Sequence, residues 1–242
     1  MKPIKIDRQN TNVKLIAHRG LSCIETENTC AAFVAAGNRD AYFGIETDVH
    51  PTADGQYVIF HDDTTYRMTG EKMNVEETDL ATLRTLHLSD VGTKEKRGDL
   101  ILPTLQEYIS ICKKYEKTAV LELKNPMSEK IICEIMGIIE QMEYLDNLMV
   151  ISFALDNLIC LRKHYPKVPA QFLLSKWDEK WLESLKEYDL GLDIKFTAVT
   201  PELVEQVHAI GQEINCWTLG TPEQAAQLIA WGVDYITTDN LE

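Results

Sequence analysis

Short runs rich in β-branched and apolar residues alternate with amphipathic helical runs along most of this 242-residue chain. We predict nine strands, at residues 14–18, 43–49, 57–61, 119–124, 148–153, 169–174, 191–196, 213–219 and 234–237. Because a parallel strand needs a long crossover to reach its neighbour, this alternation favours a parallel sheet surrounded by helices. At this length the pattern predicts an α/β barrel rather than a β-sandwich or a helical bundle.

Helical periodicity fills most of the intervals between these strands. We predict helices over residues 28–36, 103–115, 128–142, 200–210 and 221–231. Gly37 would cap the first helix at its C-terminus, and Pro103 would occupy the first turn of the second helix. Isoleucines on one face support the third helix, and a Thr-Pro-Glu start supports the last two.

Two stretches depart from this alternation. Nine strands exceed the eight of a closed α/β barrel, and only residues 51–56 separate the second strand from the third. This gap is too short for a helical crossover, so we expect an irregularity there. Residues 62–102 are polar and only partly helical, which indicates an insertion on one rim. We therefore expect a single domain over residues 1–242 with an inserted subdomain at about 62–102.

The net charge of −14 limits the partners of the chain. Proteins that bind nucleic acids or anionic membranes normally carry a basic patch, and no cluster of lysines and arginines stands out in this sequence. No apolar run approaches the roughly 18–20 residues that a membrane span needs. We expect no nucleic-acid partner, no stable membrane association, and a monomer or a homodimer.

Features of the N-terminus and of the cysteines indicate the compartment. The first 14 residues carry charge and precede no apolar block, so we expect no signal peptide. The six cysteines are widely spread and form no CxxC pair. Such cysteines are typical of a reduced, cytoplasmic protein.

Carboxylates concentrate at two predicted strands. Glu46 and Asp48 are two residues apart, so both side chains point to the same face of their strand. Glu122, near the end of another strand, adds a third carboxylate at the rim where α/β barrels place their active sites. Buried carboxylates repel one another unless a cation lies between them, and oxygen ligands without cysteine or clustered histidine favour Mg²⁺ or Ca²⁺ over Zn²⁺. The alternative is a set of salt-bridged side chains on a solvated rim.

Basic side chains lie at the same predicted rim. His18 and His61 both end strands, and two histidines beside a metal fit a general acid–base pair. Arg19 offers a bidentate fork suited to a phosphoryl group. Together with Lys124 and a cation, it would concentrate positive charge in an otherwise acidic chain, as an anionic substrate requires.

Two aromatic side chains lie near strand ends. Phe153 ends a strand in the run VISF, and Trp217 lies near the end of the run INCWTL. Either could line a pocket wall for the apolar side of a small polyol. The alternative for both is ordinary packing inside a barrel.

The chain resembles the glycerophosphodiester phosphodiesterase family. The resemblance rests on the order of HRG, a downstream ETD, then HD and then ELK, which together are far more specific than HRG alone. It extends from Ala17 to Asp239. The matching runs are IAHRG, ETENT, GIETDVH, DGQYVIFHDDT, LPTLQEY, LELK, ISF, CWTL and GVDYITTD.

This resemblance implies a fold and a set of site residues. The fold is a distorted TIM barrel with a small subdomain inserted after the HD strand. By this resemblance, the family's divalent-metal ligands correspond to Glu46, Asp48 and Glu122, and its catalytic histidines to His18 and His61. Its phosphate-binding arginine corresponds to Arg19, and its active-site lysine to Lys124. Glu27 would be a partner near that arginine.

The implied activity is metal-dependent hydrolysis of glycerophosphodiesters to glycerol 3-phosphate and an alcohol. Departures from the family pattern at Thr26, Gly220 and the residues after Asp239 concern substrate preference more than chemistry. One alternative is a lysophospholipase D-type activity on lysophospholipids. Others are an aldolase-type barrel with Lys124 as a Schiff-base lysine, which would need no metal, and a non-catalytic binding protein on the same fold.

Overall fold

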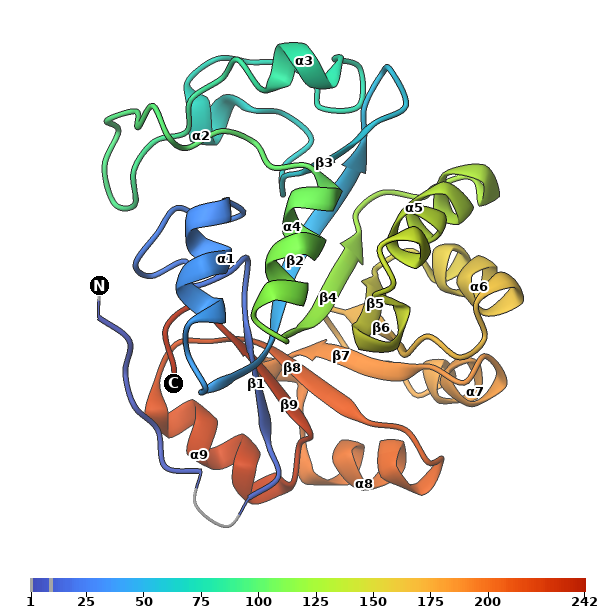
Figure 1. Ribbon diagram of the computed structural model, residues 1–242. Helices are drawn as coiled ribbons and strands as arrows, with labels where there is room; N and C mark the ends of the chain where they lie inside the picture. The colour runs from blue at the N-terminus through green and yellow to red at the C-terminus, as the bar shows by residue number, and fades with distance from the viewer. Residues whose placement is uncertain (1, 9–10) are drawn as a thin grey trace.

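The computed structural model describes residues 2–8 and 11–242 and shows a barrel of parallel strands surrounded by helices (Figure 1). All strands except β3 pair in parallel in the order β1-β9-β8-β7-β6-β5-β4-β2, and pairing of β1 with β2 closes the barrel. The predicted α/β barrel is therefore confirmed. The strands are β1 (Lys14–Ala17), β2 (Tyr42–Pro51), β3 (Tyr57–Ile59), β4 (Thr118–Leu123), β5 (Leu148–Ser152), β6 (Ala170–Leu174), β7 (Gly191–Lys195), β8 (Ile214–Leu219) and β9 (Tyr235–Thr238).

One of the nine strands, β3, lies outside the barrel. β3 pairs antiparallel with the far end of β2, with Val49 opposite Ile59. The connection is a tight turn in which the amide of Thr52 donates to the carbonyl of Gln56 at 2.8 Å. β2 therefore contributes its first part to the barrel and its last part to a hairpin. This hairpin is the irregularity that the short gap at residues 51–56 predicts.

Helices connect most of the strands and cover the outside of the barrel (Figure 1). The five predicted helices are all present, as α1, α4, α5, α8 and α9. The helices are α1 (Cys30–Gly37), α2 (Tyr66–Thr69), α3 (Leu80–Leu83), α4 (Leu105–Lys114), α5 (Glu129–Gln141), α6 (Leu155–His164), α7 (Lys180–Glu187), α8 (Pro201–Ala209) and α9 (Pro222–Trp231), with short 3₁₀ turns at Leu145–Asn147 and Phe196–Ala198.

Two predicted helix ends are wrong. Gly37 is the last residue of α1 rather than its cap, and a Cβ atom there would lie 2.6 Å from the ring of Tyr115. Close packing, not a left-handed cap, therefore requires this glycine. Pro103 precedes α4, whose N-cap is Thr104, and Glu107 completes a reciprocal capping box with that threonine.

The segment between β3 and α4 forms a separate layer, drawn at the top of Figure 1 and containing α2 and α3. A small apolar cluster of its own stabilises it together with the end of the hairpin. Polar contacts hold the segment to the loop before α1. Among them, the hydroxyl of Thr26 donates to the carbonyl of Ser89 at 2.7 Å, and Arg97 binds Glu25 at 2.7 Å. The cluster comprises Val58, Phe60, Val75, Leu83, Leu86, Leu88, Leu100 and Leu102.

The inside of the barrel is filled rather than open. Apolar side chains from several strands form a plug, which Trp217 contacts. Ile16, Val120 and Tyr235 each lie two residues before a polar residue of the barrel mouth, so the plug lies one layer beneath that mouth. The plug comprises Ile16, Val120, Met149, Ile151, Leu173 and Tyr235.

Tyr108 on α4 joins the outer helices to the barrel. Its buried hydroxyl donates to the carbonyl of Ile45 at 2.7 Å. We expect Tyr108→Phe to lower the free energy of unfolding by about 1–2 kcal/mol, because a buried carbonyl loses a hydrogen bond. Urea denaturation would measure this loss. Tyr66→Phe, at a side chain that is 61% exposed, should change stability by less than about 0.5 kcal/mol; equal effects of the two substitutions would contradict the assignment.

Candidate active site

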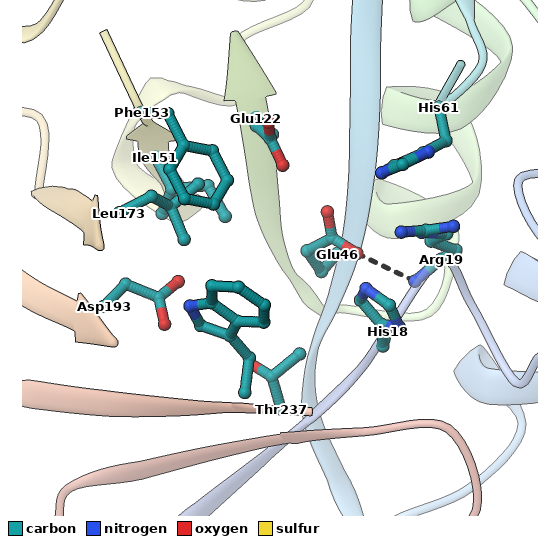
Figure 2. Close-up of a pocket in the computed structure, with 11 residues that line it drawn as sticks. His18, Arg19, Glu46, His61, Glu122, Ile151, Phe153, Leu173, Asp193 and Thr237 are labelled. Carbon is teal, nitrogen blue, oxygen red and sulfur yellow. Dashed lines mark hydrogen bonds between the residues drawn. The ribbon is translucent and has the colours of Figure 1, made fainter. Parts of the chain in front are cut away.

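Three carboxylates meet at the barrel mouth. Glu46 and Asp48 project from β2 and Glu122 from the adjacent β4, where Asp48 and Glu122 are register partners. One oxygen of each carboxylate lies within 4.8 Å of the other two, and all three side chains are buried. Figure 2 shows Glu46 and Glu122 directed toward a common cavity. The alternation of side chains along β2, read from the sequence, is what brings Glu46 and Asp48 to one face.

Electrostatics at this cluster favour a bound cation. Burial and repulsion from Asp48 raise the pKa of Glu46 well above its usual value and that of Glu122 to about 7. Burial would also raise the pKa of Asp48, but the charges of Lys124 and Arg19 outweigh burial and lower it to about 2. Three closely spaced carboxylates thus share two cationic side chains, and a further positive charge would stabilise the ionised form of all three.

The oxygen atoms of the cluster fit a hard divalent cation. Asp48 Oδ1 and Glu122 Oε1 are buried and lie 3.3 and 2.9 Å from Lys124 Nζ, and neither makes a well-directed hydrogen bond among the described residues. Neither oxygen is committed elsewhere, so both could coordinate a cation. Mg²⁺ and Ca²⁺ take such all-oxygen ligand sets.

Asn28 orients Asp48. Its Nδ2 donates to Asp48 Oδ2 at 2.7 Å, and its own Oδ1 accepts from the hydroxyl of Thr47 at 2.7 Å. Asn28 thereby fixes one carboxylate oxygen and leaves the other facing the cluster. The sequence analysis assigned no role to Asn28, although it lies in the ENT run of the family pattern.

Each candidate catalytic histidine has a carboxylate partner. Asp239, after β9, lies 2.7 Å from His18 Nδ1, and Asp62 lies 2.7 Å from His61 Nδ1. A carboxylate at Nδ1 holds the proton there and leaves Nε2 for the substrate. The sequence analysis missed both partners, although Asp62 is the second residue of the HD pair and Asp239 ends the final TTD run.

The two histidines differ in their surroundings. Burial, the largest influence, lowers the pKa of His61, although the nearby Asp48 opposes this. Arg67, from the inserted segment, binds Asp62 at 2.6 Å and so competes for the same carboxylate. Burial therefore favours the neutral form of the His61 ring.

Arg19 is held on three sides. Its backbone amide donates to Glu46 Oε2 at 2.8 Å, and its guanidinium donates to Glu27 Oε1 at 2.8 Å and lies 3.6 Å from Asp48. Glu27 also binds Arg67 at 2.7 Å, so one carboxylate positions two arginines. The inserted segment therefore contributes to the charge balance of the barrel mouth.

These residues surround a cavity of about 160 Å³. Its polar side holds His18, Arg19, Glu46, His61 and Glu122, and its opposite side is largely apolar (Figure 2). On the apolar side, Phe153 and Trp217 form an edge-to-face pair with ring centroids 5.8 Å apart. Asp48, Lys124 and Glu27 lie behind the polar side and contact its residues. The structure thus brings together all ten residues that the sequence analysis selected.

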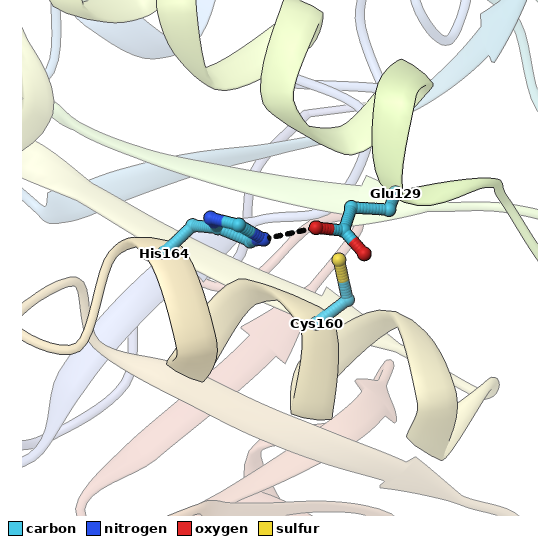
Figure 3. Close-up of side chains that lie close together, drawn as sticks. All are labelled: Glu129, Cys160 and His164. Atoms are coloured by element: carbon cyan, nitrogen blue, oxygen red, sulfur yellow. Dashed lines mark hydrogen bonds and ion pairs between the residues drawn. The ribbon is translucent and has the colours of Figure 1, made fainter.

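A second group of possible ligands lies between α5 and α6, with the side chains of Glu129, Cys160 and His164 within 4.8 Å (Figure 3). His164 Nε2 lies 2.6 Å from Glu129 Oε1, and Lys163 Nζ lies 3.0 Å from the same oxygen. Two cationic or proton-donating partners already satisfy this exposed carboxylate. We interpret the group as a surface ion-pair cluster, separate from the candidate active site.

The fold and the cavity define a class of protein: an α/β barrel with three buried carboxylates and several basic side chains at its mouth. Comparison with known proteins identifies the family. The model of the glycerophosphoryl diester phosphodiesterase family matches residues 18–242. The chain belongs to this family, and it is an enzyme of the phosphodiesterase class.

Individual relatives agree with this assignment. The putative glycerophosphodiester phosphodiesterase YhdW of Bacillus subtilis is 33% identical over 93% of both chains. A glycerophosphodiester phosphodiesterase of Caldanaerobacter subterraneus subsp. tengcongensis is 31% identical over 94% of both chains. The structure of an Oleispira antarctica phosphodiesterase in complex with the product sn-glycerol-3-phosphate aligns with a TM-score of 0.86 at 29% identity, covering 94% of this chain and 93% of that one.

Gly20 sets the turn that presents Arg19. Its φ is +78°, and a Cβ atom there would lie 2.7 Å from the backbone of Ala32. We expect Gly20→Ala to lower the free energy of unfolding by about 2–4 kcal/mol, through backbone strain and overpacking. Urea denaturation would measure the change. Gly220→Ala is a matched control, because a Cβ atom there meets nothing within 4 Å; a similar loss in both variants would refute the argument.

Proposed function

We propose that this enzyme hydrolyses glycerophosphodiesters to glycerol 3-phosphate and an alcohol, with one divalent cation at Glu46, Asp48 and Glu122. The observation that carries the proposal is a barrel mouth that brings three buried carboxylates together with two carboxylate-bound histidines and an arginine. The product sn-glycerol-3-phosphate bound to the Oleispira phosphodiesterase supports a ligand of this class.

The cation and the basic side chains would divide the negative charge of the substrate. When bound, Mg²⁺ or Ca²⁺ supplies Lewis-acid stabilisation of a phosphoryl oxygen. Arg19 and Lys124 bind the remaining phosphoryl oxygens and stabilise the charge that develops in the transition state. Phe153 and Trp217 line the side of the cavity that receives the carbon skeleton of the glycerol unit.

The histidines transfer the protons. One removes a proton from the nucleophile, which is water or the substrate's own 2-hydroxyl group, and the other protonates the departing alkoxide. Asp239 and Asp62 hold the Nδ1 atoms of His18 and His61, so that Nε2 of each ring is left for these transfers.

The environment of Lys124 disfavours an aldolase-type reaction. Burial would lower the pKa of Lys124, but the adjacent Asp48 and Glu122 outweigh burial and raise it. A Schiff base requires a neutral amine as the nucleophile. Lys124 therefore serves better as a permanent positive charge.

We also propose that residues 1–242 form one domain in which about 62–102 is an inserted subdomain. The separate apolar cluster of the segment supports this division. Among the described residues, no helix is long and apolar enough to cross a bilayer. We keep the expectation of a cytoplasmic protein, monomeric or homodimeric, without a nucleic-acid partner.

Removal of the cation should abolish turnover of glycerophosphocholine. We expect EDTA to lower the rate at least 100-fold and either Mg²⁺ or Ca²⁺ to restore it, because uncompensated carboxylates would repel the phosphate. Release of choline would be measured. Glu122→Gln should prevent restoration, whereas the matched variant Glu129→Gln, in the surface cluster, should not. Full activity in EDTA would rule out the metal-dependent mechanism.

Loss of the His61 imidazole should affect turnover more than binding. We expect His61→Ala to lower kcat roughly 100-fold or more, because a positioned acid or base contributes about that much. Binding of glycerol 3-phosphate, measured by calorimetry, should change only a few-fold. His164→Ala serves as the surface control. Turnover near the wild-type rate would remove His61 from the mechanism.

A further inference from the structure

One buried acid in the cavity has no part in the reaction described above. Asp193 lies on β7, lines the cavity and is only 2% exposed. Figure 2 shows its carboxyl group directed into the cavity from the side opposite Arg19 and His61. Its Oδ1 atom is buried and has no hydrogen-bond partner among the described residues. An unpaired buried polar atom costs about 1–3 kcal/mol, and a ligand group that hydrogen-bonds to Oδ1 would offset this cost.

A second unpaired atom lines the same cavity. Nε1 of Trp217 is buried and has no hydrogen-bond acceptor among the residues that the structure describes. The indole N–H can only donate, whereas a carboxyl oxygen accepts. A hydroxyl group can donate to the carboxyl oxygen of Asp193 and accept from the indole N–H of Trp217. The two orphaned atoms therefore favour a hydroxyl-bearing ligand.

The register partners of Asp193 carry no charge. Its register partners are Leu173 on β6 and Asn215 on β8, and Asn215 Oδ1 accepts from the hydroxyl of Thr237 at 3.1 Å. Burial, followed by repulsion from Glu122, raises the pKa of Asp193 well above its usual value. A carboxyl group hydrogen-bonds to a hydroxyl in either protonation state.

The side of the cavity at Asp193 is buried, since Asp193 and Leu173 are only 2% and 3% exposed. The apolar plug of the barrel, which includes Ile16, Val120 and Met149, lies beneath the mouth. A group that reaches Asp193 must therefore be the end of the ligand. A hydroxyl that carries a long acyl chain would have no space for that chain.

We propose that Asp193, together with Trp217, binds the free terminal hydroxyl of the glycerol unit, the one farthest from the phosphate. The proposal rests on the proposed function, which places the phosphate at Arg19 and so directs the glycerol unit toward β7. It names the substrate class more narrowly: glycerophosphodiesters with an unacylated terminal hydroxyl, rather than lysophospholipids that carry a chain at that position.

Two product analogues test this inference on the Mg²⁺-loaded enzyme. The probes are sn-glycerol 3-phosphate and 1,2-propanediol 1-phosphate, which lacks only the terminal hydroxyl. We expect the wild type to bind the first roughly tenfold more tightly, as one neutral hydrogen bond to a buried group predicts. Asp193→Ala should bind the two probes equally, and Asp193→Asn, which keeps an acceptor oxygen, should retain most of the preference. Calorimetry would measure all six affinities.

If Asp193 had only a structural role, Asp193→Ala would weaken the binding of both probes by the same factor. The ratio of the two affinities would then stay at the wild-type value, and this result would overturn the inference. Equal binding of the two probes by the wild type would overturn it as well. A second comparison uses glycerophosphocholine and 1-acyl-lysophosphatidylcholine, and the wild type should turn over the first at least tenfold faster at equal concentration. Absence of glycerophosphocholine turnover by the metal-loaded wild type would instead contradict the proposed function, and the inference would fall with it.

Discussion

The burial of three carboxylates at the ends of β2 and β4 is the constraint on which the rest of the barrel mouth depends. Such a cluster is unfavourable unless positive charge and hydrogen bonds surround it. The structure provides these through the Arg19 amide and guanidinium, the Lys124 ammonium and the Asn28 amide. The arrangement that stabilises the carboxylates also concentrates positive charge where a phosphodiester would bind.

The segment between β3 and α4 contributes charged side chains to the site. Arg67 joins Asp62 to Glu27, and Glu27 in turn binds Arg19, so a chain of ion pairs connects the segment to the barrel. Charge-assisted hydrogen bonds of this kind fix the direction of each side chain. The segment between β3 and α4 therefore helps to position Asp62 and Glu27, which contact His61 and Arg19 at the barrel mouth.

Much of the fold was predictable because the signals are local. The alternation of strands and helices, the carboxylates two residues apart on β2 and the short gap before β3 are visible within a few residues of sequence. The helix ends at Gly37 and Pro103 were predicted wrongly because a glycine or a proline can occupy more than one position near the end of a helix. Gly37 is set by contact with Tyr115, a residue after a different helix, and no nearby residue indicates that contact.

The sequence by itself determined the barrel and which polar side chains stand at its mouth, because side-chain alternation and strand ends are properties of short segments. Only the tertiary structure decided how those side chains pair. Asp239 lies beside His18, 221 positions away, because β9 pairs with β1 in the barrel. Asp193 meets the same cavity from β7, where the sequence shows only one acid in an apolar strand. Such pairings depend on closure of the sheet, a long-range event that no local pattern contains.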